Sequence, residues 1–227
     1  MKNLLLILLL FTTFGVFAQN GKIFFETNFN TFSHSSLSSF QEELKNDILG
    51  TPIKVTDDFP SNIGFTLGYE ITNSNTAIFA SYNATGGKIS YSDFSGVLRV
   101  EEALSAITIG GIYYFVLKSV PNFKFGLRGF TMFSNLNLDS YSQIGDTINQ
   151  EEVKFNAIDF GAGIQFNYEY PLLFLKIRAN LGYDLTFGGK LKFKENSDLN
   201  LVNDANEDVT TGWSGLRIGL GVAIPIK

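Results

Sequence analysis

The sequence predicts an all-β fold, a closed antiparallel transmembrane β-barrel of about eight strands with short periplasmic turns and long extracellular loops. Along most of the chain after residue 20, apolar residues alternate with polar or small ones at a period of two. Charged residues make up only 17% of the chain while aromatic residues reach 15%, so something other than water is expected to cover part of the surface. Beyond the first segment no apolar run is long enough for a membrane-spanning helix, which leaves a barrel as the way to cross a bilayer.

Residues 1–18 predict a cleavable signal peptide. Lys2 precedes the apolar run 4–11, and Val-Phe-Ala stands before Gln19, where a signal peptidase would cut. A membrane anchor would also need an apolar run, but no cationic stop-transfer cluster follows this one. The expected domains are therefore a signal peptide at 1–18 and an outer-membrane β-barrel domain at 19–227.

Composition excludes several classes of protein and partner. The absence of cysteine removes disulfides, thiolate metal sites and thiol catalysis from a chain expected to cross an oxidising compartment. It also excludes a lipoprotein anchor after the signal peptide. The net charge of −5 gives no basic footprint for nucleic acid. We expect no nucleic-acid partner and no cofactor.

Three segments, 61–72, 158–170 and 216–226, show the alternation most clearly. In each, one face is apolar and the other holds glycine, polar or charged residues, as in a strand with two different environments. The apolar rows are Ile63, Phe65, Leu67, Tyr69 and Ile71; Ile158, Phe160, Ala162, Ile164, Phe166, Tyr168 and Tyr170; and Leu216, Ile218, Leu220, Val222, Ile224 and Ile226.

Strands and links follow a regular order. Eight strands are expected, near 21–30, 61–72, 75–88, 98–117, 122–135, 153–169, 172–193 and 212–226. Short turns at 73–74, 119–121 and 170–171 alternate with longer polar links at 31–60, 89–97, 136–152 and 194–211. Insertion from the periplasm produces this asymmetry, whereas a soluble barrel such as a lipocalin has no reason to separate its loops by length.

The polar face is expected to line the barrel interior, because its charges have both signs and can pair across a narrow lumen. Its charged members are Glu70, Lys124, Arg128, Asp159, Glu169, Lys176, Arg178, Asp184 and Arg217. Aromatic residues near the short turns are expected to form a belt at the membrane surface. They are Tyr69, Tyr113, Tyr114, Phe123, Tyr168, Tyr170 and Phe174.

With these features the mature chain resembles the small eight-stranded outer-membrane β-barrel proteins of the OmpA/OmpX type. The resemblance includes the Gly-x-Gly-Ile-x-Phe-x-Tyr pattern at 161–168 and the last strand at 215–226. It implies the outer membrane of a Gram-negative-type bacterium, contact with outer-membrane lipid and lipopolysaccharide, and insertion by the barrel-insertion machinery. Such families commonly end in an aromatic residue, and this chain departs from that pattern because it ends Ile-Pro-Ile-Lys at 224–227.

The first long link holds the one candidate for chemistry. His34 and Ser36, with Glu42 or Glu43 as the acidic member, resemble weakly the nucleophilic set of outer-membrane lipases and deacylases. The simpler interpretation is a solvated loop, so we assign no catalytic residue and expect no enzyme. A short helix is expected at 38–49, where Phe40, Leu44 and Ile48 recur at four-residue spacing, either over the barrel mouth or against its rim.

Charged residues gather in the predicted outer loops. The acidic ones have no fixed ligand spacing, so divalent-cation binding and simple solvation both remain open and no metal site is assigned. Lys190, Lys192 and Lys194 fall on one face near the outer rim, where they suit lipopolysaccharide phosphates or pairing with the acidic loops. The acidic residues are Asp57, Asp58, Asp139, Asp146, Glu151, Glu152, Asp198, Asp204, Glu207 and Asp208.

A barrel of eight strands has an interior that side chains can fill, so a wide pore is not expected. The leading hypothesis is an outer-membrane barrel with a structural or surface-interaction role, whose loops meet an extracellular partner. Two alternatives are an outer-leaflet lipid-modifying enzyme that uses His34 and Ser36, and a soluble periplasmic lipid carrier with an apolar lumen.

Overall fold

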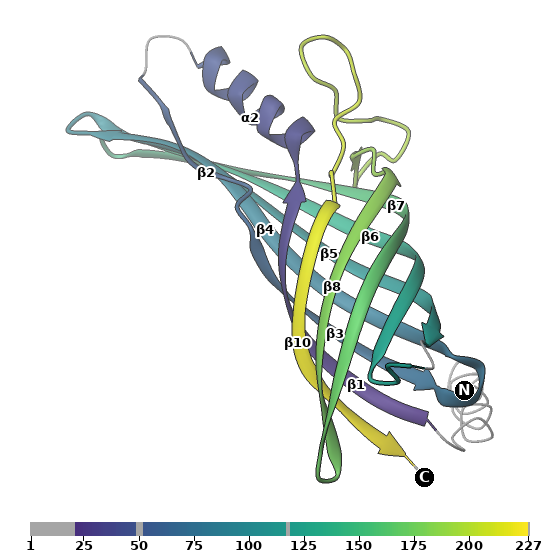
Figure 1. Ribbon diagram of the computed structural model, residues 1–227. Coiled ribbons are helices and arrows are strands. Elements are labelled where there is room, and N and C mark those ends of the chain that lie inside the picture. The colour runs from purple at the N-terminus through teal and green to yellow at the C-terminus, as the bar shows by residue number, and fades with distance from the viewer. Residues whose placement is uncertain (1–20, 49–51, 117–118, 227) are drawn as a thin grey trace, which may run out of the picture.

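The computed structural model describes residues 21–48, 52–116 and 119–226, so the signal peptide predicted at 1–18 lies outside the described residues. Eight long strands form the barrel wall (Figure 1). They are β1 (Gly21–Ser33), β3 (Asn62–Ile71), β4 (Thr76–Asp93), β5 (Gly96–Val116), β6 (Phe123–Ile144), β7 (Thr147–Leu172), β8 (Leu175–Gly188) and β10 (Ser214–Ile226). The remaining elements are α2 (Ser35–Asp47), β2 (Lys54–Asp58), the short 3-10 helix η1 (Thr72–Ser74) and β9 (Lys192–Phe193).

The wall is a closed ring of antiparallel strands. Each strand pairs with its neighbours along the chain, and β1 closes the ring by pairing with both β3 and β10. The closing register places Gly21 opposite Ile226, so the start of β1 and the end of β10 lie together at the short-turn end. The predicted fold class is confirmed.

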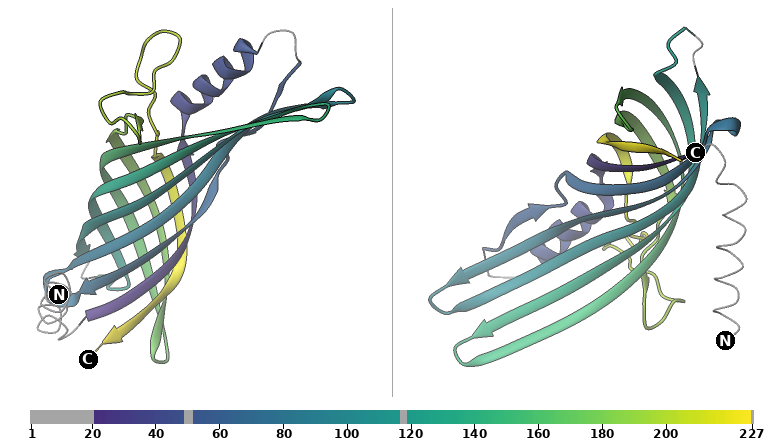
Figure 2. Two further views of the ribbon diagram at one scale, coloured as in Figure 1. Left: turned by 180° about the vertical axis from the view of Figure 1, so that it is seen from behind. Right: turned by 90° about the horizontal axis from the view of Figure 1, so that it is seen from below.

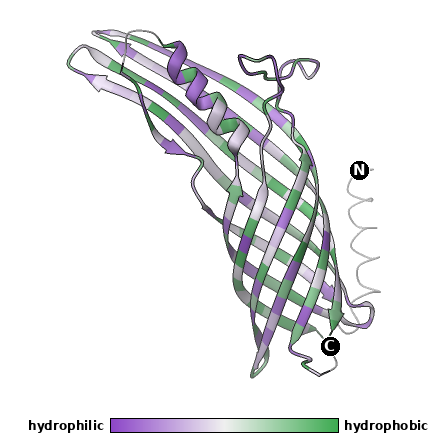
Figure 3. Cartoon of the chain, turned by 45° about the horizontal axis from the view of Figure 1, so that its top comes forward, coloured by the Kyte–Doolittle hydropathy of each residue, from purple (hydrophilic) through white to green (hydrophobic). Residues whose placement is uncertain are grey.

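An apolar band surrounds the ring, and the interior of the membrane part holds buried charged residues with apolar side chains such as Phe24 and Phe79 between them. On β5 the outward residues Ile107, Ile109, Tyr113 and Phe115 are 47–56% exposed, as lipid-facing side chains are in the absence of lipid. Above Ile107 the outward positions carry no large apolar residue until the hairpin tip and include Ser105, Glu101 and Arg99, so the band ends there. Figure 3 shows hydrophilic residues gathering at the outer ends of the strands and on α2. Among the described residues, no helix is long and apolar enough to cross a membrane.

Two of the predicted long loops, 89–97 and 136–152, are instead strands. Strands β4 and β5 continue to a turn at 94–95, and β6 and β7 continue to a turn at 145–146. Figure 2 shows these two hairpins extending far beyond the barrel as one sheet. The prediction was wrong because only a few side chains near the base of these hairpins, such as Ile89 and Leu136, are buried. Most of the others are in contact with water, so these strands do not need the full apolar alternation that marks the membrane part.

The predicted strand 172–193 also differs. The turn between β7 and β8 lies at 173–174 rather than 170–171, and β8 ends at Gly188. Gly188 and Gly189 have φ of +97° and +67°, a conformation that glycine adopts without steric cost, so the chain leaves the barrel wall there. Three residues after Gly189 the chain returns to β7 as the short strand β9.

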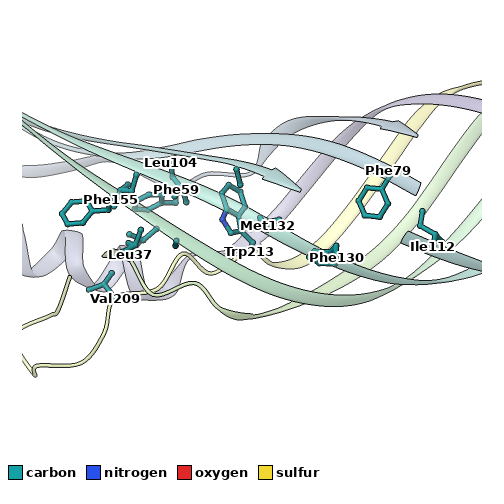
Figure 4. Close-up of a cluster of buried hydrophobic side chains, with 14 of the residues drawn as sticks. Leu37, Phe59, Phe79, Leu104, Ile112, Phe130, Met132, Phe155, Val209 and Trp213 are labelled. Carbon is teal, nitrogen blue, oxygen red and sulfur yellow. The ribbon is translucent and has the colours of Figure 1, made fainter. Parts of the chain in front are cut away.

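The outer mouth is filled by apolar side chains. The helix predicted at 38–49 is confirmed as α2, and Leu37 and Phe40 on its inner face are buried. They belong to a cluster that includes Phe59, Trp213 and Val209 (Figure 4). Because Val209 comes from the link between β9 and β10, α2 and the last long link together close the mouth.

Candidate functional site

The short-turn end of the interior is filled by a network of buried ion pairs. Arg178, 1% exposed, lies between three carboxylates, with Nε 2.5 Å from Glu26 and Nη1 3.4 Å from both Glu70 and Glu169. Glu70 and Glu169 also pair with Lys22 and with Lys124. Lys22 Nζ lies 3.0 Å from Glu70 and 2.8 Å from Glu169. Charges of both signs therefore satisfy one another across the lumen, as predicted.

A second polar layer lies nearer the middle of the barrel. Arg217 contacts Asp184 at 3.4 Å and donates to Gln165 Oε1 at 3.0 Å, and Arg128 lies 3.5 Å from Asp184. The Arg128 guanidinium also stacks on the ring of Phe79, 4.3 Å from the centroid, a favourable cation–π arrangement. A cavity of about 10 Å³, room for about one water molecule, lies between these side chains.

Of the nine charged residues predicted for the lumen, eight are buried there and Lys176 is half-buried at its end. Lys22 and Glu26 were missed, although the alternation along β1 places both on the interior face. Because the interior is polar and the apolar row faces outward, the alternative of a soluble carrier with an apolar lumen is excluded.

The aromatic belt needs one correction, at Tyr114. Tyr113, Tyr168, Tyr170 and Phe174 are exposed on the outer wall near the short turns, as predicted. Tyr114 is only 1% exposed and lies inside, where its hydroxyl accepts a hydrogen bond from Arg178 Nη2 at 2.5 Å. Successive residues of a strand point to opposite faces, so Tyr113 and Tyr114 cannot share the belt.

His34 and Ser36 do not contact each other as a catalytic pair would. Each is hydrogen-bonded to the backbone of the last long link at the mouth. His34 is 4% exposed, so the predicted solvated position is wrong; its Nδ1 donates to Thr211 O at 2.5 Å and its ring meets Trp213 edge-on. Burial lowers the pKa of His34. Ser36 Oγ accepts a hydrogen bond from Thr210 N at 3.0 Å.

The acidic partners considered for His34 are engaged elsewhere. Glu42 pairs with Lys45 on α2, and Glu43 accepts a hydrogen bond from Asp204 N at 3.1 Å. The acidic loop residues also remain dispersed. Across the described ranges, no three His, Asp or Glu side chains come together as a group that could hold a metal ion.

One buried carboxylate was missed by the sequence reasoning. Glu102 faces inward from β5 beneath α2, above the apolar band and therefore outside the membrane. It is 2% exposed, and neither carboxylate oxygen has a hydrogen-bond partner among the described residues. Burial, with the nearby charge of Asp58, raises its pKa to about 8. Glu102 is therefore largely protonated at neutral pH.

The projecting sheet has an open edge along β7. Over 147–153, β7 pairs with β6 on one side, and no other described strand covers its second side. A cleft of about 470 Å³ lies beside this edge, between 151–154 and 193–195. Its lining carries three glutamates and two lysines: Glu151, Glu152, Glu195, Lys154 and Lys194.

A second cleft, of about 420 Å³, lies between β7 and the segment that follows β8. Lys190, Lys192 and Lys194 line it together with Ile158, an outward residue of the apolar band. The three lysines predicted to share a face thus line one cleft.

Comparison with protein-family models and with curated proteins finds no match to this chain. Solved structures match it over nearly its whole length. A major outer membrane protein from Thermus thermophilus is 10% identical with a TM-score of 0.52, over 90% of this chain and 98% of that one. Neisserial surface protein A is 12% identical with a TM-score of 0.42, over 90% and 96% of the two chains. Ail of Yersinia pestis, in complex with the heparin analogue sucrose octasulfate, is 14% identical with a TM-score of 0.40, over 91% and 97%.

The first of these likenesses is close enough to support the fold. Together with the closed ring of eight strands, the outward apolar band and the ion pairs of the interior, it shows that the chain has the fold of a small outer-membrane β-barrel, the architecture that the sequence resemblance implied.

Proposed function

We propose that this protein has a surface-interaction role, in which the open edge of β7 in the projecting sheet binds an extended segment of an extracellular polypeptide. The observation that carries the proposal is the length of the strands. β7 spans 26 residues, whereas a strand needs only about 10 to cross a bilayer, so the outer part of the sheet holds its shape beyond the membrane. An uncovered strand edge is a template for an added strand.

The backbone groups at this edge can be assigned from its hydrogen bonds. Gly189 N donates to Ile158 O at 3.1 Å, and Lys194 N donates to Lys154 O at 2.8 Å. Even-numbered residues of β7 therefore direct their backbone groups away from β6. The pairing with β6 continues without a shift to Thr147, so Gln150 and its even-numbered neighbours present free N–H and C=O groups at the open edge.

The charge beside the edge favours a basic partner. Glutamates outnumber lysines in the adjoining cleft, and Lys154 is already paired with Glu152 at 2.8 Å. An added strand with lysine or arginine on the side facing the cleft would meet complementary charge.

Phage-displayed linear peptides, selected against the protein in nanodiscs, test the proposal. We expect enrichment of extended basic peptides, and loss of their binding in Gln150→Pro, which removes one edge N–H without taking a hydrogen bond from the β6 ladder. Gln150→Ala keeps the N–H and is the matched control. Equal binding to the proline and alanine variants, or no enrichment over empty nanodiscs, would contradict the proposal.

We further infer that the barrel conducts no solute, because the buried charges around Arg178 fill its interior. Planar bilayers containing the purified protein should show no stable unitary current steps, whereas a general porin inserted in the same bilayer should. Steady steps that depend on this protein would overturn the inference. Insertion by the barrel machinery stays a prediction.

The lipid-modifying alternative has no observation in its favour, since His34 Nδ1 and Ser36 Oγ are both bound to backbone groups of the last long link. His34→Ala is therefore expected to affect only the packing of the mouth. Loss of a lipid-deacylating activity in this variant, with the mouth intact by hydrogen exchange, would restore the alternative.

A further inference from the structure

The lysine-lined cleft lies at the upper boundary of the apolar band. Phe160 on β7 and Phe187 on β8 are directly paired and both are 63% exposed on the outer wall. Ile158 follows one step above them, 54% exposed. Lys192 is paired with Asn156, one outward position above Ile158, or roughly 7 Å along the strand. Lys192 thus stands where a bilayer changes from acyl chains to headgroups, and Lys194, beside Lys154, lies farther out.

Two of the three lysines form no ion pair with an acidic side chain, although the charge of Lys192 also contributes to lowering the pKa of Asp208. Lys190 pairs with Asp208 at 2.6 Å. In the part of the chain that the structure describes, Lys192 and Lys194 form no ion pair within 4.0 Å. Lys88 also lies on the outer surface, but unlike Lys192 and Lys194 it forms an ion pair, with Glu101 at 2.9 Å.

We propose that this cleft binds the phosphorylated headgroup of an outer-leaflet lipid, with Lys192 and Lys194 on the phosphate and the acyl chains along Ile158, Phe160 and Phe187. Two uncommitted cations supply charge complementarity to an anion. The exposed apolar residues directly below supply the surface that a soluble phosphate would not use. The occupant is therefore an anionic amphiphile of the membrane itself.

The cleft owes its shape to the path of the chain. The backbone turns out of β8 at Gly188 and Gly189, and both glycines line the cleft between Ile158 and the lysines. The proposal needs the barrel to lie in a membrane but is independent of peptide binding at the edge of β7. Gln150→Pro should therefore leave lipid binding unchanged.

Native mass spectrometry of the full barrel in detergent micelles tests the proposal, with purified lipid A as the probe. Lipid A carries both phosphate groups and acyl chains. We expect bound lipid A on the wild-type protein and about 30-fold weaker binding in the double variant Lys192→Gln, Lys194→Gln, the combined effect of two surface lysines. The matched control is Lys45→Gln, Lys88→Gln, which removes the same charge elsewhere and should bind as the wild type does.

Two further measurements test which cleft and which chemical group of lipid A account for the binding. Because Lys194 also lines the cleft at the edge of β7, the single variant Lys192→Gln should by itself weaken lipid A binding about 5-fold. Inorganic pyrophosphate should not compete at lipid concentration; equal competition would replace the lipid with a soluble phosphate and overturn the proposal. Equal binding by the double variant and its control would also overturn it, as would absence of lipid A on the wild type.

Discussion

The membrane part of the barrel and its outer end differ in which side chains face inward and which face outward. In the membrane part, ions such as Arg178 and Glu169 are inside and apolar side chains such as Leu220 are outside. At the outer end, Trp213 and Leu37 are inside and the surface is polar. The same alternating strands run through both regions, so the difference comes from the surroundings: lipid accepts apolar side chains and water does not.

The comparison also shows where each region derives its stability. Inside the membrane part, paired charges share the lumen with apolar side chains such as Phe24 and Phe79, on which the arginines stack. At the mouth, water drives the burial of α2 and of the last long link on an apolar cluster. Substitutions of one kind should therefore have different effects in the two regions.

The largest effect is expected from Arg178→Ala. It leaves Glu26, Glu70 and Glu169 without their central partner, and loss of one member of a buried ion network costs about 4 kcal/mol. Urea unfolding in vesicles, followed by gel mobility without boiling, measures the free energy of unfolding. The matched control is Lys176→Ala, whose side chain is 33% exposed and whose contact with Glu169 should contribute under about 1 kcal/mol. Equal losses in the two variants would show that the network is not what holds this interior together.

Trp213→Ala should open the mouth and leave the ring closed. The substitution removes a fully buried ring and its hydrogen bond from Nε1 to Ser134 Oγ at 2.9 Å, a loss of about 3 kcal/mol. Hydrogen exchange should quicken in α2 and 201–211 while the heat-dependent gel shift is retained. Phe94→Ala, at a fully exposed hairpin tip, is the control and should change neither. Loss of the gel shift in Trp213→Ala would mean that the two regions fold as one unit.

The cost of placing arginine at an exposed apolar position should show whether lipid or water surrounds that position. Leu220→Arg, in the apolar band, should cost about 2 kcal/mol because the charge faces the bilayer. Ile148→Arg, at a similarly exposed position on the projecting sheet, should cost close to nothing because water already surrounds it. The same unfolding assay compares them, and equal costs would place the apolar band elsewhere.

The most local effect, a change in the exchange rates of α2, is expected from pH. The pKa of Glu102 is raised to about 8 from an ordinary value of 4.5, so the folded mouth holds a proton that the opened mouth releases between these values. Packing of α2 should therefore be strongest below about pH 4.5, weaken as the pH rises toward 8, and then stay constant. Hydrogen exchange of α2 amides, corrected for intrinsic rates, measures this slope. Glu102→Gln should flatten it, and an unchanged slope in that variant would assign the pH dependence to another group.

Some residues that the sequence analysis misplaced or omitted could have been placed from the alternation of their own strand. The interior position of Tyr114 follows from the alternation once Tyr113 is placed outward, and Lys22 and Glu26 follow from β1 in the same way. Other residues could not be placed in this way. Beyond the few buried residues near their base, such as Ile89 and Leu136, the outer halves of β4 to β7 are largely in contact with water, so their composition resembles that of loops.

The sequence by itself determined the strand order, the outward face and the charged interior, because each rests on the period of two and on a bilayer that rejects unpaired polar groups. Tertiary structure alone decided which residues close the mouth and that, among the described strands, one side of β7 stays unpaired over 147–153. It also decided which of the described lysines form no ion pair. These depend on contacts between segments far apart in the chain, such as His34 with Thr211, and no local pattern encodes them.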